Sequence, residues 1–195
     1  MLPQPPSGLL PCEVSARALL EGAIAHCSRR HCTPCESVLR RLRSGDPELH
    51  STLRYALAKG LSNHLSQLSC TFRGVYVYGS ALAHEAAPCS DIDMIFVVSH
   101  SCDEVARLLR NLDLALVTSY RHLLGLGRQP ASLLDVRVVD ASEESARSGP
   151  AALLWGVFTK PVCLWNSTSS TAKRMPQGAC PVHPSACVDE ELLHL

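Results

Sequence analysis

The chain has 195 residues, of which 46% are hydrophobic and 18% are charged. This length and composition fit one ordinary domain with a buried core and exclude a disordered chain. Lysine plus arginine equals aspartate plus glutamate, with 18 of each. The chain therefore has no net positive charge to attract a long polynucleotide, and a nucleic-acid substrate is disfavoured.

The location expected from the sequence is the cytoplasm, with no membrane contact. No apolar run has the length of about 20 residues that crosses a bilayer. The opening residues MLPQPPSGLL lack the charged start and the apolar stretch of a signal peptide. The ten cysteines are irregularly spaced, and in a reducing compartment most of them are expected to be thiols.

Three parts of the chain differ in composition. Residues 1–45 are predicted to be an N-terminal extension that is partly helical, with short helices over 13–25 and 35–43 after a proline-rich start. Residues 46–166 are predicted to be the main domain. Residues 167–195 are rich in Ser, Thr and Pro, and we expect a poorly ordered tail.

The clearest helix is predicted over residues 47–68. Asp46 can cap its start, and Pro47 occupies a first-turn position where a missing N–H does no harm. Gly60 is a mild weakness in its interior. The helix is amphipathic because leucines follow at spacings of three and four, at positions 49, 53, 57, 61, 65 and 68.

The rest of the main domain alternates strands and helices. GVYVYGS (74–80) is β-branched and aromatic and ends in Gly-Ser, which indicates a strand entering a turn. Ser101 and Glu104 resemble a capping box that opens a helix running, with a break, towards Gly125. This order predicts an α/β or α+β domain with a small mixed sheet packed against helices. The other expected elements are strands over 91–98, 132–140 and 160–165, and partly helical structure over 142–156.

One stretch of sequence carries a chemical pattern. Gly79-Ser80 is followed, after ten residues ending in Ser90, by Asp91-Ile-Asp93. Gly79 has no side chain, so backbone N–H groups can approach a phosphate, and Ser80 adds a hydroxyl donor. Ser90 directly precedes the acidic pair and joins these two as a candidate nucleotide-binding residue. The stretch therefore predicts a phosphate-binding turn next to an acidic site.

The two aspartates predict a metal site. Aspartates two residues apart on a strand point to the same face, so Asp91 and Asp93 can share divalent ions, which prefer oxygen ligands. Two such ions about 3.5–4 Å apart stabilise the entering and the leaving oxygen in phosphoryl transfer. Two aspartates at the head of an apolar strand are poor strand formers, which favours a functional role over a surface one.

Gly-Ser, a spacer and Asp-x-Asp between apolar strands resemble the signature of the polymerase β-like nucleotidyltransferases, in particular the minimal nucleotidyltransferases. The resemblance covers about residues 47–165. It implies the polymerase β-like fold, a metal-dependent nucleotidyltransferase with two Mg²⁺ ions, and a third carboxylate on a later strand. Asp135 in SLLDVRVVD fits that third position best, and Asp113 and Asp140 are the alternatives.

The resemblance implies transfer of a nucleoside monophosphate, AMP from ATP being expected, to a hydroxyl acceptor. The acceptor could be a small helical partner protein, as in a toxin–antitoxin pair, or a small molecule, as in antibiotic-modifying relatives. Family members often carry a basic residue after Gly-Ser and a glycine three positions later, but here these are Ala81 and His84. A catalytically weak or inactive module that neutralises a partner is the alternative from another class.

A cluster of cysteines and histidines lies in the N-terminal extension. Cys32-Thr-Pro-Cys35 has a spacing that suits zinc, and Cys180 with His183, or Cys187, could complete such a site. Free thiols or a redox pair rank above zinc, because no second C-x-x-C exists. The nearby arginines at 29, 30, 40, 41 and 43 are expected on a solvated helix face rather than at a phosphate contact.

Overall fold

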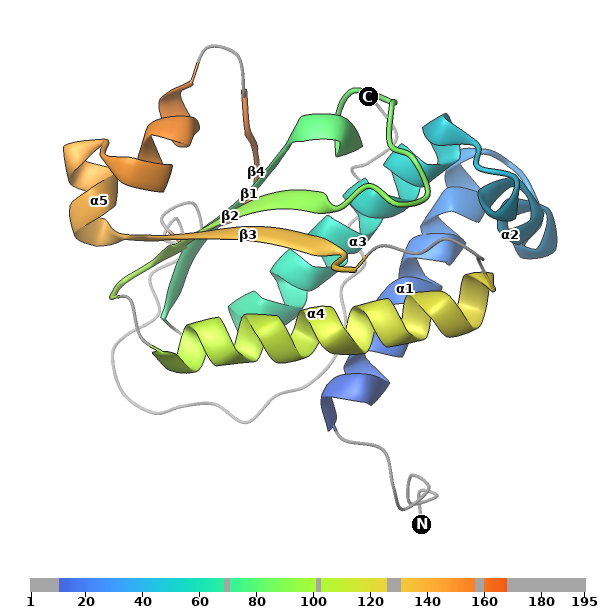
Figure 1. Cartoon of the computed structure of the whole chain (residues 1–195), viewed down its shortest axis with the longest axis horizontal. Helices are drawn as coiled ribbons and strands as arrows, with labels where there is room; N and C mark the ends of the chain where they lie inside the picture. Colours follow the sequence, from blue (N-terminus) through green and yellow to red (C-terminus); the bar gives the residue numbers. More distant parts are fainter. Residues whose placement is uncertain (1–10, 69–70, 101–102, 126–130, 157–159, 168–195) are drawn as a thin grey trace, which may run out of the picture.

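The computed structural model describes residues 11–68, 71–100, 103–125, 131–156 and 160–167. They form an α+β domain with a small mixed sheet and helices packed on it, as predicted (Figure 1). None of the helices in these ranges has both the length and the apolar character needed to span a bilayer. The elements in chain order are α1 (Pro11–Arg30), α2 (Cys35–Arg43), α3 (Pro47–Leu68), β1 (Phe72–Tyr78), η1 (Gly79–Ala81), β2 (Ile92–Val98), α4 (Asp103–Leu124), β3 (Leu134–Asp140), α5 (Ala141–Ala146), η2 (Gly149–Trp155) and β4 (Val162–Asn166).

The sheet has four strands in the order β3-β2-β1-β4. β1 pairs antiparallel with both β2 and β4, whereas β2 and β3 run parallel. Parallel strands need a long crossover, which here is α4. The crossover brings the start of β3 beside the start of β2 (Figure 1).

One face of the sheet is covered by helices. Val77 of β1 and Met94 of β2 are fully buried in the same core as Leu57 of α3 and Leu116 of α4. Helix α1 belongs to this core as well, through residues such as Leu20. The leucines predicted at 49, 53, 57, 61 and 65 are all buried, so the stripe expected from the sequence is the face that α3 turns inward.

The opposite face of the sheet is covered only in part. Ile95 and Val139 form a smaller buried cluster there with Ala151 of η2. Tyr76 and Tyr78 of β1 pack against this cluster, and Tyr78 pairs with Asp93 across β1 and β2. Alternate residues of a strand share a face, so Asp93 lies on the same face as Ile95, away from α3 and α4.

The bounds of several predicted elements are confirmed. Helices α2 and α3 begin and end where the sequence placed them. Helix α1 is longer than the expected 13–25, and α4 is continuous where a break was expected. The capping role of Ser101 falls outside the described residues. β1 ends at Tyr78 and not at residue 80, because Gly79 adopts a positive φ of 74° and starts the 3-10 turn η1.

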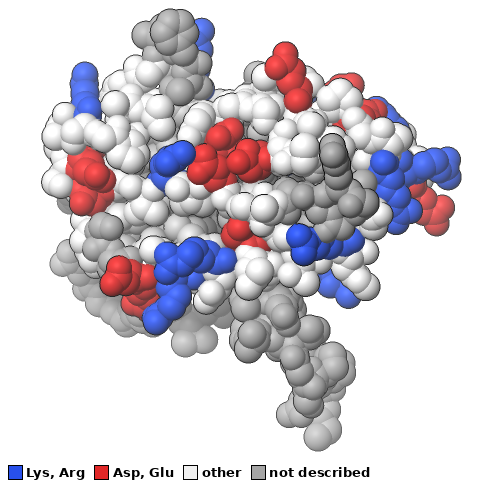
Figure 2. Space-filling model, viewed as in Figure 1, with Lys and Arg blue, Asp and Glu red and all other residues white. Residues whose placement is uncertain are grey.

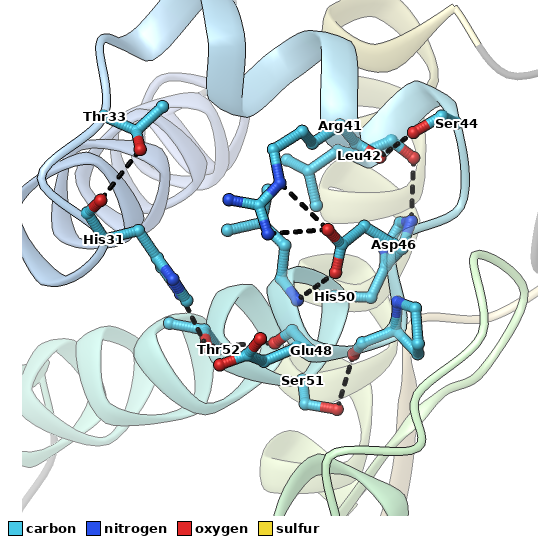
Figure 3. A network of polar contacts seen from close by, with 12 residues as sticks. His31, Thr33, Arg41, Leu42, Ser44, Asp46, Glu48, His50, Ser51 and Thr52 are labelled. Carbon is cyan, nitrogen blue, oxygen red and sulfur yellow. Dashed lines mark hydrogen bonds and ion pairs between the residues drawn. The ribbon is translucent and has the colours of Figure 1, made fainter.

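The turn between α2 and α3 is fixed by Asp46. One of its carboxylate oxygens accepts from the backbone N–H of Leu49 at 3.1 Å, which is the predicted helix cap. The other accepts from Nε and Nη2 of Arg41 at 2.9 and 2.7 Å (Figure 3).

Gly60 of α3 lies where α1 approaches, since a Cβ there would be 3.2 Å from Cδ2 of Leu19.

Candidate functional site

Gly79 and Asp93 are in direct contact at the end of β1. A Cβ on Gly79 would overlap Oδ2 of Asp93 and lie 2.9 Å from its Cγ. The positive φ of Gly79 also favours glycine over any other residue. The glycine at this position is therefore required twice, by the turn and by the carboxylate that packs on it.

Strand pairing brings a second carboxylate to Asp93. Asp93 of β2 is the register partner of Asp135 of β3 in the parallel pair, so the two side chains are neighbours on the same face of the sheet. Asp91 lies one residue before β2 and is exposed. The three aspartates singled out in the sequence thus gather where β2 and β3 begin, next to the turn that follows β1.

The charges of this group interact. Burial, reinforced by the negative charges of Asp91 and Asp135, raises the pKa of Asp93 to about 6. Arg137, two residues after Asp135 in β3, acts in the opposite direction. Burial and then the charge of Asp93 also raise the pKa of the Tyr78 hydroxyl. On the side of the molecule that Figure 2 shows, acidic side chains cluster near the middle, with a basic side chain next to them.

The donor chemistry of the group fits a hard divalent cation, because carboxylate oxygens are the ligands such ions prefer and a cation would relieve the repulsion at Asp93. In the described part of the chain, however, no three carboxylate, imidazole or thiol side chains converge on one point as a metal site requires. Asp135 instead accepts from Nη2 of Arg137 at 3.2 Å. Metal binding by all three aspartates therefore requires their side chains to come closer together than they lie in this structure.

The two alternatives for the third carboxylate have structural roles. Asp113 of α4 accepts from the backbone N–H groups of Leu133 and Leu134 at 2.8 and 2.9 Å, and so fixes the entry to β3. Asp140 caps α5 in a reciprocal capping box with Glu143. Asp135 is the remaining candidate from the sequence, and it is the one beside Asp93.

The predicted phosphate-binding residues lie in two turns. Ser80 is the middle residue of η1, directly after Gly79. The Ser90 hydroxyl accepts from the backbone N–H of Ala87 at 2.9 Å and closes the turn before Asp91. Ala81 is buried in the main core, whereas His84 is exposed with a positive φ of 58°. The position that is basic in the family pattern is thus a packing position here.

Sequence reasoning missed the residues that hold the segment before Asp91. Arg54 of α3 is 1% exposed and donates through Nε and Nη2 to the carbonyl of Ser90 at 3.0 and 2.7 Å. Its Nη2 also donates to the carbonyl of Pro88 at 3.1 Å, and the Tyr120 hydroxyl donates there at 3.4 Å. The helical spacing of His50, Arg54 and Leu57 is the signal that could have indicated a buried arginine.

His50 completes this network in its neutral form. Its Nε2 lies 2.9 Å from the carbonyl of Leu42, which can only accept, and its Nδ1 lies 3.0 Å from Nη1 of Arg54, which can only donate. The imidazole therefore carries its proton on Nε2. Burial, and then the charge of Arg54, lowers the pKa of His50 from 6.5 to about 4.

This depressed pKa predicts a loss of stability in acid. The contribution of neutral His50 is fully present above pH 6.5 and is lost as the pH falls towards 4. We expect the advantage of the wild type over His50→Gln in unfolding free energy to shrink by about 1 to 3 kcal/mol over that range. Urea unfolding at several pH values measures it. Asp93 titrates in the same pH range, and its contribution to stability changes in the opposite direction. Because Asp93 is present in both proteins, its contribution cancels in the difference. A pH-independent difference would contradict the prediction.

The cysteine cluster is placed in part. Cys32 and Cys35 are exposed free thiols at the turn between α1 and α2, and Cys27 is a buried thiol whose pKa is raised to about 12 by burial. Cys180, His183 and Cys187 lie outside the described residues, so the zinc hypothesis stays a prediction. Comparisons of the chain with protein-family models, with curated proteins and with solved structures found no match, so the function proposed below depends on the motif resemblance and on the residues of the site.

Proposed function

We propose that this protein is a metal-dependent nucleotidyltransferase of the polymerase β-like type, which transfers a nucleoside monophosphate, AMP from ATP, to a hydroxyl acceptor. The observation that carries the proposal is the packing of Asp93 against Gly79, with Asp91 one residue before β2 and Asp135 opposite in β3. A motif of glycine, serine and two aspartates could arise by chance in the sequence. The contact of Gly79 with Asp93, and the pairing of Asp93 with Asp135, support a shared role for the turn and the carboxylates.

Each residue of the site would have a distinct role. Asp91, Asp93 and Asp135 would hold Mg²⁺, which when bound supplies positive charge to the reacting phosphate. Gly79 and Ser80 would bind the phosphates of the nucleotide through backbone and hydroxyl donors. Asp135 would also accept the proton of the acceptor hydroxyl. Phosphoryl transfer needs little covalent chemistry from the protein, so positioning and charge stabilisation are its main contributions.

The acceptor follows from the same resemblance. The proposed acceptor is a small helical protein, as in a toxin–antitoxin pair, and the alternative acceptor is a small molecule, as in antibiotic-modifying relatives. A cytoplasmic location is part of the proposal.

The test uses the full chain with ATP labelled at the α-phosphate, Mg²⁺ and a cell extract as the source of acceptors. We expect transfer of label to an acceptor, and its loss in Asp91→Asn and Asp93→Asn, since amides bind divalent ions far more weakly than carboxylates. Asp113→Asn is the matched control because it removes an acidic side chain with a structural role at the entry to β3. If wild type labels no acceptor, or if Asp93→Asn labels as well as wild type, the enzyme proposal fails.

A second candidate is a binding module that uses the same face without catalysis. The observation that favours it is the pairing of Asp135 with Arg137, together with the absence of a basic residue at Ala81. Such a module would bind its partner equally well with and without Mg²⁺. Affinity purification of the wild type and of Asp93→Asn would then recover the same partner in equal amounts, in EDTA and in Mg²⁺ alike.

A further inference from the structure

A cavity of about 210 Å³ lies on the helix side of the Gly79–Ala81 turn. Its walls come from three parts of the chain: the end of α1, the first half of α3, and the end of η1 with the residues that follow it. Ala81 and Leu82 form part of its apolar lining, so the turn that contacts Asp93 on one side forms a wall of this cavity on the other.

The polar groups of the cavity are basic side chains and hydroxyls. His26 and Arg30 reach it from α1, one turn apart, and His84 reaches it from the loop after η1. None of the described residues that line it is acidic, and Tyr55 adds a hydroxyl. Burial, and then the positive charges of Arg29 and Arg30, lower the pKa of His26, which is the effect expected in a positive environment.

The walls are held together by contacts between elements. Nε2 of His31 lies 3.2 Å from Oγ1 of Thr52, which ties the end of α1 to α3 (Figure 3). The Ser51 hydroxyl accepts from the backbone N–H of Ala86 at 3.0 Å and ties α3 to the loop that carries His84. The cavity is thus built from packed elements and is not a gap between loops.

We propose that this cavity binds a phosphate group of a substrate, with Arg30 as its principal cation and His26 and His84 beside it. A concave site with cationic and hydroxyl donors and no carboxylate is complementary to a phosphate. The choice of phosphate over other anions rests on the proposed function. The nucleotidyltransferase pattern has a basic residue at the position of Ala81. In this proposal Arg30 of α1, which lines the same cavity as Ala81, supplies the missing positive charge.

The test is isothermal titration calorimetry of the full chain in EDTA at low salt, with tripolyphosphate, ATP and inorganic phosphate as separate probes. We expect Arg30→Ala to weaken binding by about tenfold, the effect of one lost charge-assisted contact at a partly open site. Arg29→Ala is the matched control, since Arg29 is the preceding exposed arginine of α1 and does not line the cavity. It is expected to change affinity by less than about twofold.

The three probes distinguish the source of the phosphate. If the cavity holds the triphosphate of the nucleotide, Arg30→Ala weakens ATP and tripolyphosphate equally, and ATP displaces inorganic phosphate. If it holds a phosphate of the acceptor, Arg30→Ala weakens inorganic phosphate alone, and ATP and phosphate bind together. Either result supports the site.

Equal effects of Arg30→Ala and Arg29→Ala would overturn the inference, as would a wild type that binds none of the probes at millimolar concentration. Thermal unfolding of both variants checks that each is folded. A failure of the proposed function gives another result. Neither the wild type nor any variant then transfers label, while phosphate binding still depends on Arg30. Transfer of label without a role for Arg30 removes the cavity site alone.

Discussion

Replacing Gly79 with alanine is expected to lower the free energy of unfolding by about 2 to 4 kcal/mol. Two effects add. The positive φ of 74° is strained for any residue with a side chain, and the new Cβ overlaps the Asp93 carboxylate. The carboxylate must turn away, so we also expect the variant to lose affinity for Mn²⁺, measured by electron paramagnetic resonance.

A second glycine separates these effects. Gly125, at the end of α4, has a positive φ of 57°, but a Cβ there meets no atom within 4 Å. Gly125→Ala therefore carries the backbone strain alone, about 1 to 2 kcal/mol, and is expected to keep its Mn²⁺ affinity. In an Asp93→Ala background the cost of Gly79→Ala should fall to that of Gly125→Ala. Equal costs for Gly79→Ala with and without Asp93 would contradict the contact.

Replacing Arg54 with methionine is expected to destabilise the fold by about 3 to 5 kcal/mol. Methionine fills much of the same volume, but it leaves the carbonyl of Ser90 without its donor and the carbonyl of Pro88 with the Tyr120 hydroxyl alone. The effect should extend to the site, because these carbonyls belong to the segment that leads into Asp91. Urea unfolding measures the stability, and hydrogen exchange of the amides from Ala86 to Asp91 measures the local loosening.

Arg107 provides the control for charge and length. It is an exposed arginine of α4, and Arg107→Met is expected to change stability by less than about 0.5 kcal/mol. A loss below about 1 kcal/mol for Arg54→Met would show that water replaces the guanidinium at the two carbonyls. The anchoring role of Arg54 would then be wrong, although the gathering of the aspartates would not be affected.

The sequence predicted those elements that are determined by residues close together in the chain. The bounds of α3 follow from the Asp46 cap, Pro47 and the leucine stripe, all of which lie within the helix or next to it. The strand character of β1 and β2 and the mixed sheet also followed from residue type and spacing. The start of β1 was missed because Phe72 joins the sheet only through its partner Val98, which no local pattern reveals.

The parts of the site that depend on distant contacts were not predicted. Arg54 lies on the inward face of α3, where a charged side chain is not expected, and its hydrogen bonds to His50 and to the carbonyls before Asp91 explain it. The role of α1 was left open, yet its His26 and Arg30 line the cavity beside the Gly79–Ala81 turn. The partner of Asp135 within its own strand, Arg137, was likewise unassigned.

The register of β2 against β3 has a consequence for folding. In the native pairing Asp93 faces Asp135, whereas a slip of two residues would keep every side chain on its face and place Arg137 opposite Asp93. When no cation is bound, the attraction between Asp93 and Arg137 favours the slipped register. The native register must therefore be selected by the apolar residues on the other face, such as Met94 and Leu134. The site's carboxylates lie side by side because hydrophobic packing outweighs the attraction between Asp93 and Arg137.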